Sequence, residues 1–170
     1  MEGSPPSLNF MRRPPMLTLN TAEDAARLLK QAQERIGERV RFVPLQPLHW
    51  RVVFDDGGAF QIEWSDTWGR LVLIAELGVP SVDGERQALN LALAYNAQWR
   101  QVGNLRMARD SDDGELILIG ELGREAQAPE TFDAALLHFE GLRRWWGGVL
   151  MHVGSEAVEP PPPNLLANCV

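Results

Sequence analysis

The residues of this chain that could perform chemistry are few and widely spaced. Its three histidines are His49, His138 and His152, and its one cysteine, Cys169, is the second-last residue. A metal site needs several such ligands held close together, and this spacing does not supply them, so we predict no metal. Lys30 is the only lysine, and it follows no glycine-rich loop of the kind that binds phosphates. The sequence therefore predicts no cofactor either.

Two acidic clusters could act as general acids and bases or bind a hard cation. Asp55 and Asp56 precede two glycines, and the cluster over 110–113 precedes Gly114. Aspartate followed by glycine is typical of tight turns for backbone reasons, and neither cluster has the spacing of a calcium-binding loop. Common catalytic motifs are absent from the sequence. We therefore predict hairpin turns and no enzyme; a small hydrolase that uses these carboxylates is the alternative.

The composition excludes several classes of protein. Of the 170 residues, 45% are hydrophobic, 16 are basic and 23 are acidic, which gives a net charge of −7. A chain of this length is expected to form one domain. The acidic balance argues against a nucleic-acid partner, since affinity for phosphates comes mainly from lysine and arginine. No apolar run approaches the roughly 20 residues of a membrane span, no signal peptide is recognisable, and the lone cysteine fits a reducing compartment, so we predict a cytoplasmic protein.

Aromatic residues give the first indication of a binding surface. The chain has six tryptophans but only one tyrosine, and tryptophan is enriched at protein interfaces as well as in cores. The run Arg143-Arg144-Trp145-Trp146 could stack on single-stranded nucleic acid. In an acidic chain we favour another interpretation, in which the arginines lie on the solvent side of a helix near its C-terminal end and Trp146 packs inward.

Prolines and apolar periodicity divide the chain into elements. Prolines cluster near both ends, which predicts a proline-rich extension over 1–16, one folded domain over 17–153 and a proline-rich, disordered tail over 154–170. Periodicity within the domain predicts a helix over 21–36, strands over 50–54, 60–64 and 71–75, a helix over 83–102, a hairpin with strands around 105–107 and 116–119, and a helix over 130–150. This order, α-β-β-β-α-β-β-α, predicts an α+β domain with a twisted, largely antiparallel sheet flanked by helices.

Local signals indicate where these elements begin and end. Pro44 and Pro47 predict a broken connection between the first helix and the first strand, and Gly37 fits the end of that helix. The predicted helix caps are Thr21 with Asp24 in a variant capping box, Asp83 for the second helix and Thr131 for the third.

The second helix is apolar around most of its circumference. One stripe at helical spacing consists of Ala88, Leu91, Tyr95, Trp99 and Val102, and further apolar residues, among them Leu89, Leu93 and Ala97, extend around the helix. An amphipathic surface helix buries only one face. The second apolar face therefore predicts contact with a second subunit; a helix buried within a monomer is the alternative.

The element order, together with four stretches of sequence, resembles the class I chaperones of bacterial type III secretion systems, which have a Tir-chaperone-like fold. The stretches are 54–64 (FDDGGAFQIEW), 71–78 (LVLIAELG), 91–96 (LALAYN) and 114–119 (GELILI). In that family a leucine-rich helix ends in an asparagine, here Asn96, and leads to a hairpin and a final helix with a central phenylalanine, here Phe139. The resemblance covers about residues 19–150.

The resemblance implies an acidic, cytoplasmic homodimer without catalytic activity, which binds the non-globular N-terminal segment of secreted effectors and keeps them competent for export. By family analogy, the dimer contact falls on the second helix and the following hairpin, at Leu89, Leu93, Ala97 and Leu105. The client grooves should involve the first helix and the three-stranded meander. Their candidate residues are Leu29, Ile36, Trp50, Phe60, Trp64 and Trp68, and we expect this set to include core residues because alternation alone does not say which strand face is outward.

Two departures from the family pattern leave alternatives open. The chain is longer than the compact family core, with extensions at both ends, and it carries extra sequence around Pro44 to Leu48. The extensions could serve several effectors or contact the export ATPase. A regulatory or immunity-type adaptor on the same fold, with a protein partner but no role in secretion, is the alternative function.

Overall fold

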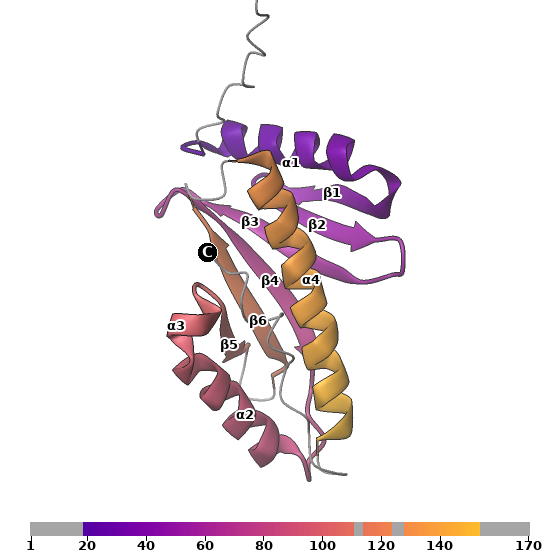
Figure 1. Ribbon diagram of the computed structural model, residues 1–170, viewed down its shortest axis with the longest axis vertical. Helices are drawn as coiled ribbons and strands as arrows, with labels where there is room; N and C mark the ends of the chain where they lie inside the picture. The colour runs from indigo at the N-terminus through magenta and orange to yellow at the C-terminus, as the bar shows by residue number, and fades with distance from the viewer. Residues whose placement is uncertain (1–18, 111–113, 124–127, 154–170) are drawn as a thin grey trace, which may run out of the picture.

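A six-stranded antiparallel sheet forms the centre of the protein, in a computed structural model that describes residues 19–110, 114–123 and 128–153 (Figure 1). The strands are β1 (Val40–Gln46), β2 (His49–Phe54), β3 (Ala59–Ser65), β4 (Arg70–Gly78), β5 (Arg106–Arg109) and β6 (Leu116–Leu122), and their order is β1-β2-β3-β4-β6-β5. The helices are α1 (Ala22–Ile36), the short 3-10 helix η1 (Gly37–Arg39), α2 (Glu85–Ala97), α3 (Trp99–Val102) and α4 (Pro129–His152). The predicted α+β class is confirmed. The predicted terminal extensions lie outside the described residues.

Helix α1 begins and ends where its sequence predicts. The Thr21 hydroxyl accepts a hydrogen bond from the Asp24 backbone N–H at 3.1 Å, and the Asp24 carboxylate accepts one from the Thr21 N–H at 3.2 Å. This reciprocal capping box satisfies donors that the helix itself leaves unpaired. Gly37, at φ 74°, ends the helix in a backbone conformation that glycine adopts without steric cost. The capping box and the end of the helix are both confirmed.

Strand β1 is the element that the sequence did not predict. It pairs with β2 from Val40 opposite Phe54 to Pro44 opposite Trp50, and the strands are joined by a tight turn at Pro47 and Leu48. Proline is tolerated in an edge strand where its missing N–H would point away from the neighbouring strand. The predicted broken connection was therefore wrong, because Pro44 lies within an edge strand and does not interrupt it.

The helices lie on one face of the sheet. Helix α4 crosses the sheet and contacts β4 and β6, α1 lies against β1 and α4, and α2 lies beside β5 (Figure 1). Alternate strand residues point to this face and are buried. The two similar stretches at 71–78 and 116–123 become β4 and β6, which pair antiparallel with each other in the middle of the sheet.

Helix α4 supplies three large aromatic side chains to the core. Phe132, Phe139 and Trp146 are all buried. Phe139 packs edge-on against Phe60, with ring centroids 4.9 Å apart, and Trp146 packs edge-on against Tyr95 of α2 at 5.3 Å. These contacts join three elements that are distant in the sequence, so α4 holds the core together.

The second and fourth helices differ from prediction at their ends. The predicted single helix over 83–102 is divided at Gln98 into α2 and α3, and its N-cap is Gly84, not Asp83. Trp99 consequently leaves the predicted apolar stripe and is exposed. Helix α4 begins at Pro129, so the predicted cap Thr131 lies inside its first turn. Proline is favoured in the first helical turn because its missing N–H has no partner there anyway.

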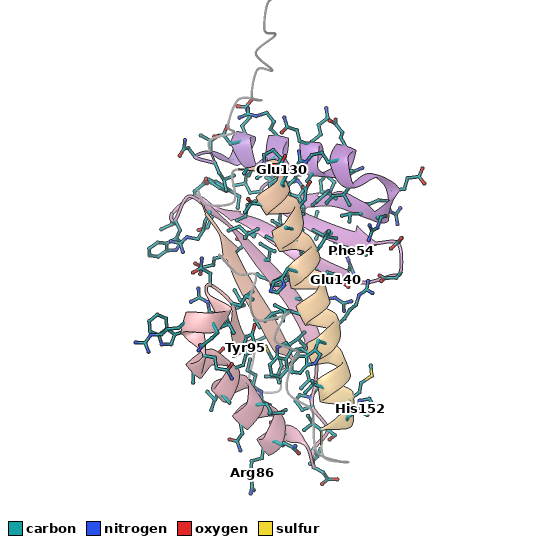
Figure 2. The ribbon with its side chains drawn as sticks, in the orientation of Figure 1. Phe54, Arg86, Tyr95, Glu130, Glu140 and His152 are labelled. Carbon is teal, nitrogen blue, oxygen red and sulfur yellow. The ribbon has the colours of Figure 1, made fainter. Side chains whose placement is uncertain are left out.

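A buried carboxylate fastens the β2–β3 hairpin to α4. Glu140 is buried, and its oxygens accept two hydrogen bonds of 2.7 Å from Arg143 and one of 2.8 Å from Arg144 (Figure 2). Arg144 also pairs with Asp56 of the hairpin turn. The hydrogen bonds to Glu140 raise the pKa of Arg143. A β-carbon on Gly58 would lie 2.3 Å from the Glu140 Oε1, so a larger residue there would displace the Glu140 side chain.

Candidate binding groove

An open groove lies between α1 and the first two strands. We call it the α1–β1 groove, and it has a volume of about 350 Å³. Its lining residues are Ala26, Leu29, Lys30, Gln33 and Glu34 from α1, Phe42 and Pro44 from β1, and Trp50 from β2. Pro44 lies opposite Trp50 in the strand register, so the groove floor is the helix-facing side of the sheet. Its walls are mostly apolar, with one cation and one anion at the rim.

Helix α1 is held in place as the wall of this groove. Ala25, Leu28, Leu29 and Ala32 are buried in the core. The Arg35 guanidinium forms two 2.8 Å hydrogen bonds to the Asp133 carboxylate of α4. This two-point pair raises the pKa of Arg35, mainly through the hydrogen bonds to Asp133. The groove therefore has a fixed width, because its helical wall is tied to the core and to α4.

The groove lies beside the free edge of β1. The Phe42 backbone N–H points away from β2 and donates to the Gln33 side-chain oxygen at 3.1 Å. Hydrogen-bonding directions alternate along an antiparallel strand, so Pro44 also faces outward, where it has no N–H to offer. Val43 and Leu45 of the same strand are 41% and 48% exposed. An apolar, unpaired edge of this kind is a template for pairing with another extended chain.

The opposite edge of the sheet, at β5, is closed by one asparagine. The Asn96 side chain of α2 donates to the Met107 carbonyl at 3.0 Å and accepts from the Met107 N–H at 2.8 Å. The N–H and the C=O of Met107, which point away from β6, are therefore both hydrogen-bonded, as they would be if another strand lay beside β5. The ion pair between Arg109 and Glu85, at 2.8 Å, joins β5 to α2 next to this contact.

The structure separates the six predicted client-binding residues into four groups. Leu29 and Trp50 line the α1–β1 groove, although Leu29 exposes little surface. Ile36 is half-buried against the core. Phe60 and Trp64 are core residues, each 3% exposed, and the Trp64 indole N–H donates to Asp66 at 2.6 Å. Both point toward the helices and pack in the core, as was expected of part of this set, and Trp68 lies elsewhere on the surface. The assignment of the six residues to client contacts stays a prediction.

Trp68 lies in a larger and more polar hollow at the β3–β4 turn. This hollow has a volume of about 730 Å³ and is lined by Leu19, Asn20, Trp68, Gly69, Arg70, Asn104, Glu121 and Gly123. Trp68 is 68% exposed, and the Arg70 guanidinium lies 5.5 Å from its ring centroid. The hollow does not include any residue of the α1–β1 groove, so Trp68 and Trp50 belong to separate surfaces.

The four residues predicted at the dimer contact divide by exposure. Leu93 is 66% exposed and Ala97 is exposed one turn further along α2, on the side away from the core. Leu89 and Leu105 are half-buried and pack against the core. The dimer contact stays a prediction, and Leu93 with Ala97 forms the part of it that is open to solvent.

The residues considered for chemistry do not converge. Asp56 accepts from the Gly58 N–H at 3.0 Å, as expected of a turn, whereas Asp112 and Asp113 lie outside the described residues. Burial lowers the pKa of His138 on α4. Within the described ranges, no group of three histidine, cysteine or acidic residues is placed to hold a metal. None of the described helices is both long enough and apolar enough to cross a bilayer.

Several residues of the groove were missed from the sequence. Gln33 belongs to α1, and Phe42 and Pro44 belong to β1, the strand that the sequence did not predict. Leu48, in the turn between β1 and β2, has φ 67°, a left-handed conformation that is uncommon for a branched apolar residue. The signal that could have found β1 is the spacing of Val40, Phe42 and Pro44, which alternates in step with the predicted strand at 50–54.

Solved structures share this arrangement of elements. The chain is similar to a chain of the ExsC-ExsE complex, with 20% identity over 77% of this chain and 96% of that one, at a TM-score of 0.60. It is also similar to a chain of the HopA1-SchA chaperone-effector complex, with 19% identity over 73% of this chain and 93% of that one, at a TM-score of 0.57. This protein has the fold found in a chaperone–effector complex. The resemblance stated from the sequence is thereby confirmed for the fold; no family model and no curated protein matches the sequence.

Proposed function

We propose that this protein is a cytoplasmic chaperone of type III secretion, which binds the non-globular N-terminal segment of effector proteins and keeps them soluble and competent for export. The observation that carries the proposal is the α1–β1 groove, an apolar channel that runs beside an unpaired strand edge. The fold shared with the HopA1-SchA chaperone-effector complex supports it.

The groove suits an extended peptide better than a compact ligand. It is open along one side and is bounded by Leu29, Phe42 and Trp50, which can receive alternate apolar side chains of a strand. A disordered segment loses conformational entropy on binding, and burial of those side chains together with backbone hydrogen bonds offsets this loss. Lys30 and Glu34 at the rim leave the groove without a strong charge preference.

The chaperone is proposed to act as a homodimer that delivers its client to the export apparatus, with the export ATPase as a further partner. The exposed apolar face of α2, on which Leu93 and Ala97 lie one turn apart, supports the dimer, since contiguous exposed apolar surface marks protein interfaces. Leu93→Arg should convert a dimer into a monomer in light scattering, whereas Leu137→Arg, at an exposed leucine of α4, should leave the dimer intact. A monomeric wild-type protein would refute this part of the proposal.

Co-expression with client segments tests the binding function. The first ~100 residues of candidate effectors, expressed with this protein, should be recovered as a soluble complex that survives gel filtration. Trp50→Ala should weaken the complex about tenfold or more, as expected for an aromatic residue in a binding groove. Leu137→Ala, at an exposed leucine of α4 outside the groove, is the control, and it should leave the affinity unchanged.

Two results would contradict this function. If every effector segment remains insoluble or unbound, the chaperone role is wrong. If affinity purification recovers a transcriptional regulator or another adaptor and no exported protein, the regulatory alternative replaces it.

A further inference from the structure

A second surface of the molecule lies apart from the α1–β1 groove and has features of a binding site. The hollow lined by Trp68, which we call the β3–β4 hollow, has about twice the volume of that groove and shares no lining residue with it. Trp68 is 68% exposed, although a tryptophan contributes most when a neighbour covers its ring. The described residues therefore leave most of a large aromatic ring open to this hollow.

Arg70 holds this ring from one side. Its guanidinium lies 5.5 Å from the centroid of the Trp68 ring. Arg70 also forms an ion pair with Glu121 of β6, and the same carboxylate binds Arg106 of β5. Because Glu121 joins three strands in this way, the cation beside Trp68 has a fixed position. A cation on one face of an indole leaves the other face free to pack against a second group.

The first described residues of the chain lie in the wall of this hollow. Leu19 and Asn20 both line it. Leu19 is 2% exposed and packs in the core, and the Asn20 N–H donates to the Asp24 carboxylate at 3.2 Å. The point from which residues 1–18 continue is therefore fixed at the wall of the β3–β4 hollow.

The residues that precede Leu19 suit the ring of Trp68. Residues 12–16 read Arg-Arg-Pro-Pro-Met. A pair of prolines favours the extended polyproline II conformation, which loses little conformational entropy on binding and is recognised by exposed aromatic side chains. Pro15 is four residues before Leu19, so at about 3.1 Å per residue it reaches about 12 Å from it. This reach exceeds the edge of a cube with the volume of the hollow, about 9 Å, so both prolines can contact Trp68.

The charges of the segment do not oppose such a contact. Arg70 and Glu121 are the charged residues that line the hollow, and they balance each other. Residues 12–16 include two arginines and no acid, whereas the chain as a whole carries a net charge of −7. The overall field therefore attracts the segment weakly, and the proline rings supply the specific contact.

We propose that residues 12–16 of this chain bind in the β3–β4 hollow, with the rings of Pro14 and Pro15 packed on the open face of Trp68. The inference goes beyond the proposed function and does not depend on it. Two residues join this segment to Leu19, so binding is intramolecular. A short tether gives an effective concentration in the millimolar range, so a contact with a dissociation constant of about 1 mM between separate molecules is formed much of the time within one chain. The segment covers an aromatic surface that would otherwise be open to other chains.

Two exposed tryptophans of this chain form a natural pair for the test. Trp99 is 61% exposed, and the Arg100 guanidinium lies 4.8 Å from its ring centroid, so its environment resembles that of Trp68 beside Arg70. Trp99 does not line the β3–β4 hollow, so it serves as the reference. Oxidative labelling read by mass spectrometry measures the rate at each tryptophan separately, and Trp146, which is 2% exposed, reports any unfolding.

Replacement of the two prolines should expose Trp68. In the double variant Pro14→Gly, Pro15→Gly, Trp68 should be oxidised about threefold faster or more than in the unmodified chain, while the reference tryptophan is oxidised at the same rate. The double variant Pro5→Gly, Pro6→Gly, which alters the earlier proline pair, is the matched control and should leave both rates unchanged. Equal rates at Trp68 with and without Pro14 and Pro15 overturn the proposal.

A peptide and a dilution series distinguish the possible occupants. A synthetic peptide of residues 10–18, added at millimolar concentration to the Pro14→Gly, Pro15→Gly variant, should restore the protection of Trp68. The same peptide with glycine in place of both prolines should not restore it, and equal effects of the two peptides overturn the role of the prolines. Protection that falls when the unmodified chain is diluted assigns the hollow to the segment of a second copy and overturns binding within one chain.

Discussion

The two edge strands of this sheet differ in how firmly their outward backbone groups are kept from pairing with another chain. Strand β5 is short, charged at both ends and closed by the two hydrogen bonds of Asn96 to Met107. Strand β1 is longer, exposes Val43 and Leu45, and is held at one N–H by the flexible side chain of Gln33. Edge strands are sites of unwanted pairing unless they are blocked. A protein that blocks one edge thoroughly and the other lightly restricts where a partner strand can add.

The largest effect on this comparison is expected from Asn96→Ala. The substitution leaves the N–H and C=O of Met107 partly buried without partners, which should lower the free energy of unfolding by about 2–3 kcal/mol. It also opens the β5 edge, so the variant should associate as its concentration rises. Denaturant unfolding and light scattering measure the two effects, with Asn90→Ala on the same helix as the control. An unchanged free energy of unfolding in Asn96→Ala would show that the two hydrogen bonds of Asn96 do not hold the β5 edge.

A smaller effect is expected from Pro44→Val, which adds a hydrogen-bond donor to the open β1 edge. Valine restores an outward N–H on β1 at the cost of the rigidity of proline, so stability should fall by about 0.5–1 kcal/mol. The restored donor should increase self-association through β1, and light scattering over a range of concentrations will detect it. Adding Val43→Lys should reverse the association, because charge on an edge strand opposes pairing. Association that lysine does not reverse would place the contact elsewhere.

Arg109→Ala tests whether charge or the asparagine closes the β5 edge. The Arg109–Glu85 ion pair is partly exposed, and such pairs contribute little to stability. The free energy of unfolding should therefore change by less than about 0.5 kcal/mol. The variant should also remain as soluble as the parent protein in light scattering. An effect as large as that of Asn96→Ala would assign the closure of this edge to the ion pair.

The smallest effect is expected at low pH, where the first turn of α1 should lose stability. The Asn20 N–H, together with the Thr21 cap and Arg27, holds the pKa of Asp24 below its ordinary value of 3.8. A lowered pKa stabilises the fold above the unfolded-state value, and this contribution is lost as the pH falls below 3.8 and through the lower folded-state pKa. Hydrogen exchange at pH 5.5 and pH 3 should therefore show the first turn of α1 loosening while the Met107 amide, bonded to uncharged Asn96, stays protected. Equal loss at both places would indicate global acid unfolding.

The sequence was sufficient where local signals and tertiary packing agree. The capping box at Thr21, the strand alternation around Trp50 and the hairpin turns all predicted the observed elements. Prediction failed at β1, because proline is an unfavourable strand residue in general and an acceptable one at an outward position of an edge strand. That distinction depends on which strand forms the edge, and strand order is a property of the whole sheet.

The candidate site was predictable only in part for a similar reason. Trp50 and Leu29 were found because they are apolar residues on the first helix and the first predicted strand, whereas Phe60 and Trp64 have the same pattern and lie in the core. Alternation identifies a face but does not say whether helices cover it. The role of Gln33 depends on its position relative to the Phe42 amide, which a sequence pattern does not contain.

The position of α4 after all six strands in the sequence has a consequence for biosynthesis. Phe132, Phe139 and Trp146 reach the sheet only after the ribosome has made the last described helix, since α4 runs from Pro129 to His152. The strands β1 to β4 pair with their sequence neighbours and can form early, but their apolar face then waits for α4 during several seconds of elongation, at about 5–20 residues per second. During that interval the nascent chain itself presents exposed apolar surface, so this protein is expected to need protection by the cell's general chaperones before it can fold.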